Sequence, residues 1–151
     1  MTRTRLILIA TIGSALLLVG AWTFQFLGYA PCKLCHWQRW PHYAAVGIGS
    51  LALLTGLRLL PWLGALAAAA TAAVGVYHTG VEQNWWLGPT TCTSCSVAGL
   101  SAEDLLDQIN NAPLIRCDEV AWALAGISMA SWNAILSAVL VAVWIAAARR
   151  V

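Results

Sequence analysis

Two cysteines near the start of the chain form a Cys-x-x-Cys motif in the segment Pro31-Cys32-Lys33-Leu34-Cys35. A pair with this spacing can close a small disulfide ring that opens and re-forms readily, and such motifs often lower a thiol pKa. Arg39 follows Cys35 by four residues. Its guanidinium is suited to holding a neighbouring anion, whether a thiolate or a reduced cofactor. The combination indicates redox chemistry.

The composition places this motif in a membrane protein. The chain has 151 residues, of which 60% are hydrophobic and 9% are charged, whereas a soluble domain has about 25% charged residues. The length suits a single domain. The net charge of +2 is too small to indicate nucleic-acid binding.

Four apolar segments without charged residues are predicted to span the membrane as helices, at 6–27, 42–57, 62–79 and 132–148. The first segment could instead be a cleaved signal peptide with Arg3 and Arg5 as its basic start. Its apolar run is longer than the roughly 7–15 residues usual for such a peptide, which favours a membrane span. The predicted fold is an all-α bundle of four transmembrane helices within one membrane domain, 1–151.

Two loops connect these spans on one side of the membrane. The first, 28–41, holds the Cys-x-x-Cys motif, with Cys35 near the start of the second helix. The second, 80–131, carries every acidic residue of the chain, and Glu82 is expected to be solvated there. Two short amphipathic helices are predicted in this loop, one capped by Ser101 and one following Cys117.

The basic residues predict the orientation. The terminal segments and the turn at 55–61 carry five of them, and the opposite side carries three: Lys33, Arg39 and Arg116. The positive-inside rule therefore predicts that both termini are cytoplasmic. All five cysteines then lie in an outer, oxidising compartment, where disulfides form.

A second Cys-x-x-Cys motif, Cys92 to Cys95, leaves an alternative open. Two such motifs can supply a four-thiolate zinc site, here Cys32, Cys35, Cys92 and Cys95. In that case the chain would be a non-enzymatic, zinc-binding membrane protein. The oxidising compartment and the fifth cysteine, Cys117, argue against zinc.

Three motifs in the same order resemble the disulfide bond formation protein B (DsbB) family. The first is the segment from Pro31 to Arg39. The second is Tyr77-His78-Thr79-Gly80, followed by Gly88-Pro89-Thr90-Thr91-Cys92, and the third begins at Cys117-Asp118-Glu119. The resemblance covers nearly the whole chain.

The resemblance implies a disulfide-generating protein-dithiol:quinone oxidoreductase in the bacterial inner membrane, with its cysteine loops facing the periplasm. Its partner would be a periplasmic thioredoxin-like oxidase of the DsbA type, bound through a transient mixed disulfide. Its electron acceptor would be ubiquinone or menaquinone, and no metal is implied. The implied catalytic residues are Cys32, Cys35, Cys92 and Cys117, and the implied quinone-binding residues are Cys35, Arg39 and His78. Cys95 is additional to the family's four cysteines, so it remains open whether Cys92 or Cys95 pairs with Cys117.

Overall fold

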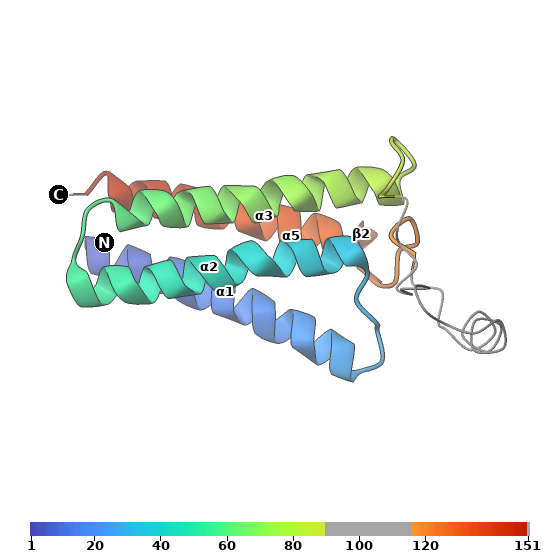
Figure 1. Ribbon diagram of the computed structural model, residues 1–151, viewed down its shortest axis with the longest axis horizontal. Coiled ribbons are helices and arrows are strands. Elements are labelled where there is room, and N and C mark those ends of the chain that lie inside the picture. The colour runs from blue at the N-terminus through green and yellow to red at the C-terminus, as the bar shows by residue number, and fades with distance from the viewer. Residues whose placement is uncertain (90–115, 151) are drawn as a thin grey trace, which may run out of the picture.

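A computed structural model describes residues 1–89 and 116–150 of the chain and shows a bundle of four long helices (Figure 1). The elements are α1 (Arg3–Phe26), α2 (Lys33–Thr55), α3 (Leu60–Glu82), β1 (Ala123–Leu124), β2 (Ile127–Ser128) and α5 (Met129–Ala148). The predicted all-α, four-helix fold is confirmed.

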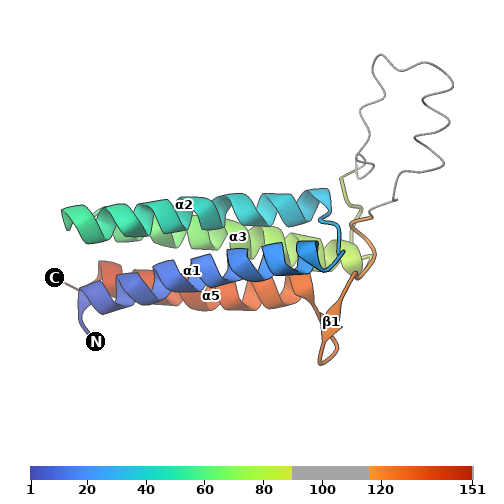
Figure 2. The same ribbon diagram turned by 90° about the horizontal axis from the view of Figure 1, so that it is seen from below.

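The helices form a ring in which α1 and α3 each pack against both α2 and α5. Both termini lie at one end of the bundle, and the small hairpin lies at the other (Figure 2). Small residues permit this packing: a Cβ atom added at Gly49 of α2 would lie 1.9 Å from the Thr11 hydroxyl of α1. Close backbone approach of this kind drives helix association where lipid removes the hydrophobic driving force.

The second helix begins earlier than the sequence predicted. Its first residue is Lys33, and Pro41 lies inside it, so the prediction of a loop as far as residue 41 is wrong. Cys32 is the N-cap, and its Sγ accepts a hydrogen bond from the backbone N–H of Cys35 at 3.1 Å. The cap satisfies a donor that the helix start would leave unpaired. The Cys-x-x-Cys motif is therefore held on the first turn of a helix.

The turn between α2 and α3 lies within the predicted turn at 55–61. Gly56 ends α2 with φ of 68°, a left-handed conformation that glycine adopts without strain. Pro61 lies in the first turn of α3, where its missing N–H costs no hydrogen bond. The Arg3 guanidinium donates to the carbonyl oxygens of Gly56 and Leu57 at 3.0 and 2.7 Å, which joins the start of α1 to this turn.

A β-hairpin precedes α5, where a short amphipathic helix was predicted after Cys117. Leu124 pairs with Ile127 across the turn, and the two turn residues, Ala125 and Gly126, have φ of 54° and 77°. Two positive φ values define the type I′ turn that joins tight hairpins. The prediction of a helix here is wrong because the turn residues were not recognised. The helix predicted after Ser101 lies outside the described residues.

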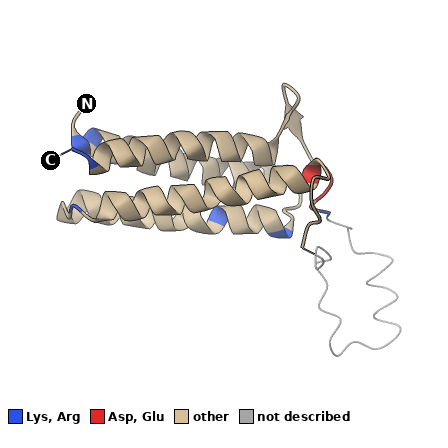
Figure 3. Cartoon of the chain, turned by 90° about the horizontal axis from the view of Figure 1, so that it is seen from above, with Lys and Arg blue, Asp and Glu red and all other residues tan. Residues whose placement is uncertain are grey.

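Among the described helices, α1, α3 and α5 are long and apolar enough to cross a membrane by length and composition. The fourth long helix, α2, is less apolar because its first half carries Gln38, Arg39 and His42. Most basic residues of the described chain gather at the end of the bundle that holds both termini, and the acidic residues lie at the other end (Figure 3).

Candidate functional site

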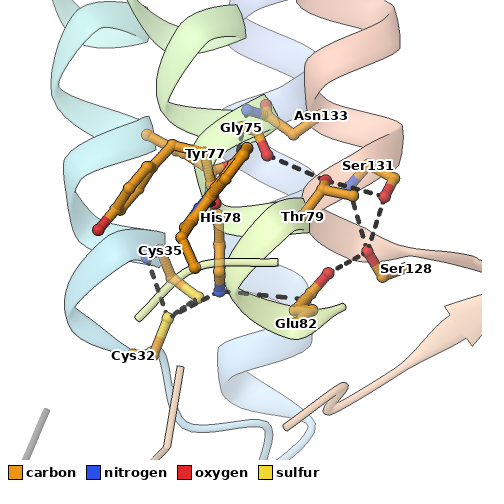
Figure 4. Close-up of polar contacts among 12 residues, drawn as sticks. Cys32, Cys35, Gly75, Tyr77, His78, Thr79, Glu82, Ser128, Ser131 and Asn133 are labelled. Carbon is orange, nitrogen blue, oxygen red and sulfur yellow. Dashed lines mark hydrogen bonds and ion pairs between the residues drawn. The ribbon is translucent and has the colours of Figure 1, made fainter. Parts of the chain in front are cut away.

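The thiol pair lies where the start of α2 meets the end of α3 (Figure 4). Cys32 is 5% exposed, Cys35 is half-buried, and both are free thiols. Their Sγ atoms are 2.6 Å apart, whereas the bond of a disulfide is about 2.05 Å long. A small side-chain movement is therefore enough to join them.

The two thiols differ in acidity because they share one hydrogen bond. Both cysteines precede the second predicted membrane span, which starts at His42. The hydrogen bond to Cys35 raises the pKa of the Cys32 thiol, and burial raises it further. The hydrogen bond from Cys32 lowers the pKa of Cys35, and the positive charge of Arg39 also lowers it, against the effects of burial and of Glu82. Cys35 is therefore the thiol that ionises first, as a cysteine near a cationic side chain does.

His78 reaches the pair from α3. Its Nε2 lies 3.6 Å from Cys32 Sγ, and its Nδ1 lies 2.7 Å from Nε2 of Gln38. The side chain is buried. The ligand atoms of Cys32, Cys35 and His78 all lie within 4.8 Å of one another, which is also close enough for three ligands of one metal ion.

The side chain of Glu82 is buried beside His78, although the residue as a whole is partly exposed, so the prediction that it is solvated is wrong. Its side chain is 5% exposed, and its Oε1 lies 4.0 Å from His78 Nε2. It accepts a hydrogen bond from the hydroxyl of Ser128, the N-cap of α5. That hydroxyl also lies 3.0 Å from the hydroxyl of Ser131. Glu82 is buried because the hairpin and the start of α5 cover the last turn of α3, an arrangement that no local sequence pattern reveals.

A cavity of about 660 Å³ adjoins the thiol pair. Most of its wall is apolar, from α1, α5 and the hairpin, and Cys35, Arg39, His78 and Glu82 also line it. Pockets that bind small molecules are typically about 300–1,000 Å³, mostly apolar, with a few placed polar groups. The cavity therefore has the size and the lining expected of a binding site for a mostly apolar small molecule that carries a few polar groups.

Arg39 spans from α2 to α1 along this cavity. Its guanidinium donates to Gln25 Oε1 at 2.7 Å and to the carbonyl oxygen of Ala21 at 3.1 Å. Its Nε is buried and has no hydrogen-bond partner within the described part of the chain. A buried N–H of a charged group without a partner is costly, so this atom is suited to an acceptor from a bound molecule.

Of the three cysteines in the second predicted loop, only Cys117 lies within the described residues. It is 2% exposed and belongs to one buried cluster with Cys32, Leu34 and Val81. Cys92 and Cys95 lie outside the described residues, so their predicted roles and the pairing with Cys117 remain predictions. The structure thus brings together Cys32, Cys35, Arg39, His78 and Cys117.

Sequence reasoning missed two polar residues in the bundle core. Gln38 bonds to His78, and Asn133 Nδ2 bonds to Gln38 Oε1 at 2.7 Å. Gln38 lies one turn after Cys35 on α2, and Asn133 lies in the first turns of an otherwise apolar helix. Polar side chains inside membrane helices are usually functional, and that signal was available in the sequence.

Comparison with known proteins decides the family. The family model described as "Disulfide bond formation protein DsbB" matches residues 3–147. The chain belongs to the DsbB family. A disulfide bond formation protein B of Verminephrobacter eiseniae is 32% identical over 91% of this chain and 81% of that protein. Another, of an Azoarcus species, is 29% identical over 91% of this chain and 88% of that protein.

Membership of the DsbB family makes this chain a multi-pass membrane protein with a role in disulfide bond formation. No solved structure gave a significant match to the chain. The DsbB assignment agrees with the geometry of the site, in which two thiols meet at the wall of an apolar cavity.

Proposed function

We propose that this DsbB-family protein is a thiol:quinone oxidoreductase of the bacterial inner membrane. It reoxidises a periplasmic thioredoxin-like oxidase of the DsbA type and passes the electrons through two cysteine pairs to ubiquinone or menaquinone. The observation that carries this proposal is that Cys35, the thiol with the lowered pKa, lines the same apolar cavity as Arg39.

The cavity residues fit a quinone. A quinone has an apolar ring and tail, which suit the apolar wall from α1 and α5, and two carbonyl oxygens that accept hydrogen bonds. The buried Nε of Arg39, which has no partner in the described residues, supplies such a donor next to the thiol pair. Cys35, Arg39 and His78 would hold the ring. A bound quinone supplies an acceptor for two electrons and two protons.

The cysteines supply the electrons by thiol–disulfide exchange. In the proposed sequence, a thiolate of the partner attacks the Cys92–Cys117 disulfide, and the partner leaves as a disulfide. The reduced outer pair then attacks the Cys32–Cys35 disulfide, and two electrons and two protons reach the inner pair. Burial of Cys117 in one cluster with Cys32 supports contact between the two pairs.

The side chains around Cys35 favour its thiolate. The hydrogen bond from Cys32 is the largest cause that lowers the pKa of Cys35, and the positive charge of Arg39, one helical turn away, lowers it further. Cys35 also lies in the first turn of α2, where the positive end of the helix dipole stabilises an anion. A thiolate is the reactive form of cysteine, so Cys35 is the proposed electron donor to the quinone.

The proposed orientation places both termini in the cytoplasm. The end of the bundle that holds the termini carries most of the basic residues of the described chain (Figure 3), which is the cytoplasmic side by the positive-inside rule. Arg58, in the turn between α2 and α3, belongs to this end. The thiol pair then faces the periplasm, where a soluble partner can reach it.

The experiment measures quinone reduction by purified protein in detergent, with dithiothreitol as the dithiol and a short-chain ubiquinone as the acceptor. The Cys35→Ser variant should lose this activity. Arg58→Gln, at the opposite end of the bundle, is the control and should keep it. Metal analysis of the same wild-type sample tests the alternative function, because stoichiometric zinc without quinone reduction would support a zinc-binding protein and contradict this proposal.

A further inference from the structure

A chain of buried polar side chains crosses the bundle behind the thiol pair. Gln38 and His42 of α2, Thr71 and His78 of α3, and Asn133 of α5 are joined by hydrogen bonds, and all except the half-buried Asn133 are buried. Polar groups in an apolar interior are stable when each donor meets an acceptor. The direction of each hydrogen bond in this network of side chains can therefore be deduced. Amide nitrogens can only donate, and amide and backbone carbonyl oxygens can only accept.

Asn133 fixes the orientation of the Gln38 amide. The Asn133 Nδ2 donates to Gln38 Oε1 at 2.7 Å and to the Thr71 hydroxyl oxygen at 3.2 Å. The Thr71 hydroxyl uses its own hydrogen on the carbonyl oxygen of Gln38, at 2.9 Å, so it must accept from Asn133. On its other side, Asn133 Oδ1 lies 3.1 Å from His42 Nε2 and accepts from it.

The orientation of Gln38 then fixes the proton of His78. With its oxygen directed at Asn133, Gln38 directs Nε2 at His78 Nδ1, at a distance of 2.7 Å. An amide nitrogen donates and does not accept, so Nδ1 must be the unprotonated ring nitrogen. The ring proton of neutral His78 is consequently on Nε2, the atom 3.6 Å from Cys32 Sγ and 4.0 Å from Glu82 Oε1. The backbone of Cys117 also hydrogen-bonds to the ring, and because Nδ1 is occupied by Gln38, this bond uses the same Nε2–H.

We propose that Gln38 and Asn133 are positioning residues that hold His78 in the tautomer with its proton on Nε2, so that this N–H is shared between the backbone carbonyl of Cys117 and the sulfur of Cys32. In this arrangement, His78 does not take the thiol proton from Cys32. It instead stabilises negative charge on Cys32 Sγ whenever that sulfur attacks or leaves during disulfide exchange. The hydrogen bond that the ring accepts on one side sets the role of the nitrogen on the other.

This inference deepens the proposed function, because it assigns a role to His78 within the same exchange step. The tautomer itself does not depend on quinone or partner. It is set by contacts among α2, α3 and α5 and can be measured in the resting protein.

The first test uses ¹⁵N NMR of histidine-labelled, full-length protein in detergent at mildly alkaline pH, with His78 assigned from a His78→Ala spectrum. Wild type should show a protonated Nε2 and an unprotonated Nδ1. Gln38→Glu is isosteric, but its carboxylate accepts a hydrogen bond, so the proton should move to Nδ1. Gln83→Glu, on the exposed C-cap of α3, is the matched control and should leave His78 as in wild type.

The second test separates positioning from folding. Asn133→Asp keeps the size of the side chain but removes the donor to Gln38, so the His78 spectrum should change to a mixture of tautomers or to the Nδ1–H form. In the same variant, the pH profile of exchange with dithiothreitol should shift, because Cys32 loses a fixed donor. A merely structural role would lower the yield of folded protein without changing either readout.

A wild-type spectrum with the proton on Nδ1, or an unchanged spectrum in Gln38→Glu, would overturn the inference. If quinone reduction persists in that event, the proposed function stands and only the tautomer assignment falls. If the tautomer is found as expected but quinone is not reduced, the proposed function falls and the positioning of His78 stands.

Discussion

Cys35 and Arg39 lie one helical turn apart on α2 and line the same cavity, and the Arg39 guanidinium bonds to Gln25 and Ala21 of α1. The thiolate-forming cysteine and a fixed positive charge are thus placed against one apolar space. The geometry arises because α2 begins at Lys33, with Cys32 as its cap.

Arg39 is expected to contribute to quinone turnover. Replacing it with Gln removes the charge and the buried Nε donor, and a hydrogen bond from a charged group contributes about 1.5–3 kcal/mol. The ratio kcat/KM for a short-chain ubiquinone should therefore fall by about tenfold or more. Arg39→Lys keeps the charge but loses the planar donor group, so it should give an intermediate value. Unchanged kcat and KM in Arg39→Gln would mean that Arg39 is only an interfacial anchor.

The acidity of Cys35 predicts a pH dependence. Its pKa is below the ordinary value of 9.0, chiefly through the hydrogen bond from Cys32 and also through the charge of Arg39. The thiolate is therefore present between the lowered pKa and 9.0, where an ordinary thiol is mostly protonated. In the fully reduced protein, alkylation of Cys35 by iodoacetamide, followed by mass spectrometry across a pH series, should show a midpoint below 9.0.

Two variants serve as controls for that profile. Arg39→Gln should raise the midpoint, and Glu82→Gln should lower it, because the negative charge of Glu82 raises the pKa of Cys35. A wild-type midpoint at or above 9.0, or shifts of the same sign in both variants, would contradict the electrostatic account of the site.

The bundle and the thiol pair were predictable from sequence because they depend on local features. Uncharged apolar stretches mark membrane helices, and the spacing of Cys32 and Cys35 marks a redox motif. The left-handed conformation of Gly56 at the end of α2 and the position of Pro61 in the first turn of α3 likewise follow from the properties of glycine and proline.

The rest of the site depends on contacts between distant segments. Glu82 carries a charge, so local reasoning placed it in solvent, but Ser128 of a remote segment covers it. The links among Gln38, His78 and Asn133 join three helices. No periodicity within one helix shows which polar residues on its neighbours they meet.

Close packing of α1 against α2 predicts a difference between two glycines of α2. A Cβ atom at Gly49 would overlap the Thr11 side chain, whereas one at Gly47 meets nothing within 4 Å. Gly49→Ala should destabilise the bundle by about 1–3 kcal/mol, the usual cost of overpacking. Gly47→Ala, the matched control, should not lower stability. Thermal unfolding in detergent measures both variants, and equal Tm values would contradict the packing.

The pairing of Cys117 is expected to involve Cys92. Disulfide mapping by mass spectrometry of resting, oxidised protein should find a Cys92–Cys117 peptide, and Cys95→Ser should leave it in place. A Cys95–Cys117 or Cys92–Cys95 peptide would require the outer pair to be reassigned.

The central claim is that quinone oxidises the Cys32–Cys35 pair directly. The most direct test uses a variant in which Cys92, Cys95 and Cys117 are replaced by Ser, fully reduced and kept without oxygen. Adding a short-chain ubiquinone should convert Cys32 and Cys35 into a disulfide that resists alkylation, with one quinone reduced for each disulfide formed. If Cys32 and Cys35 can still be alkylated and the quinone stays oxidised, direct oxidation of this pair by quinone is contradicted.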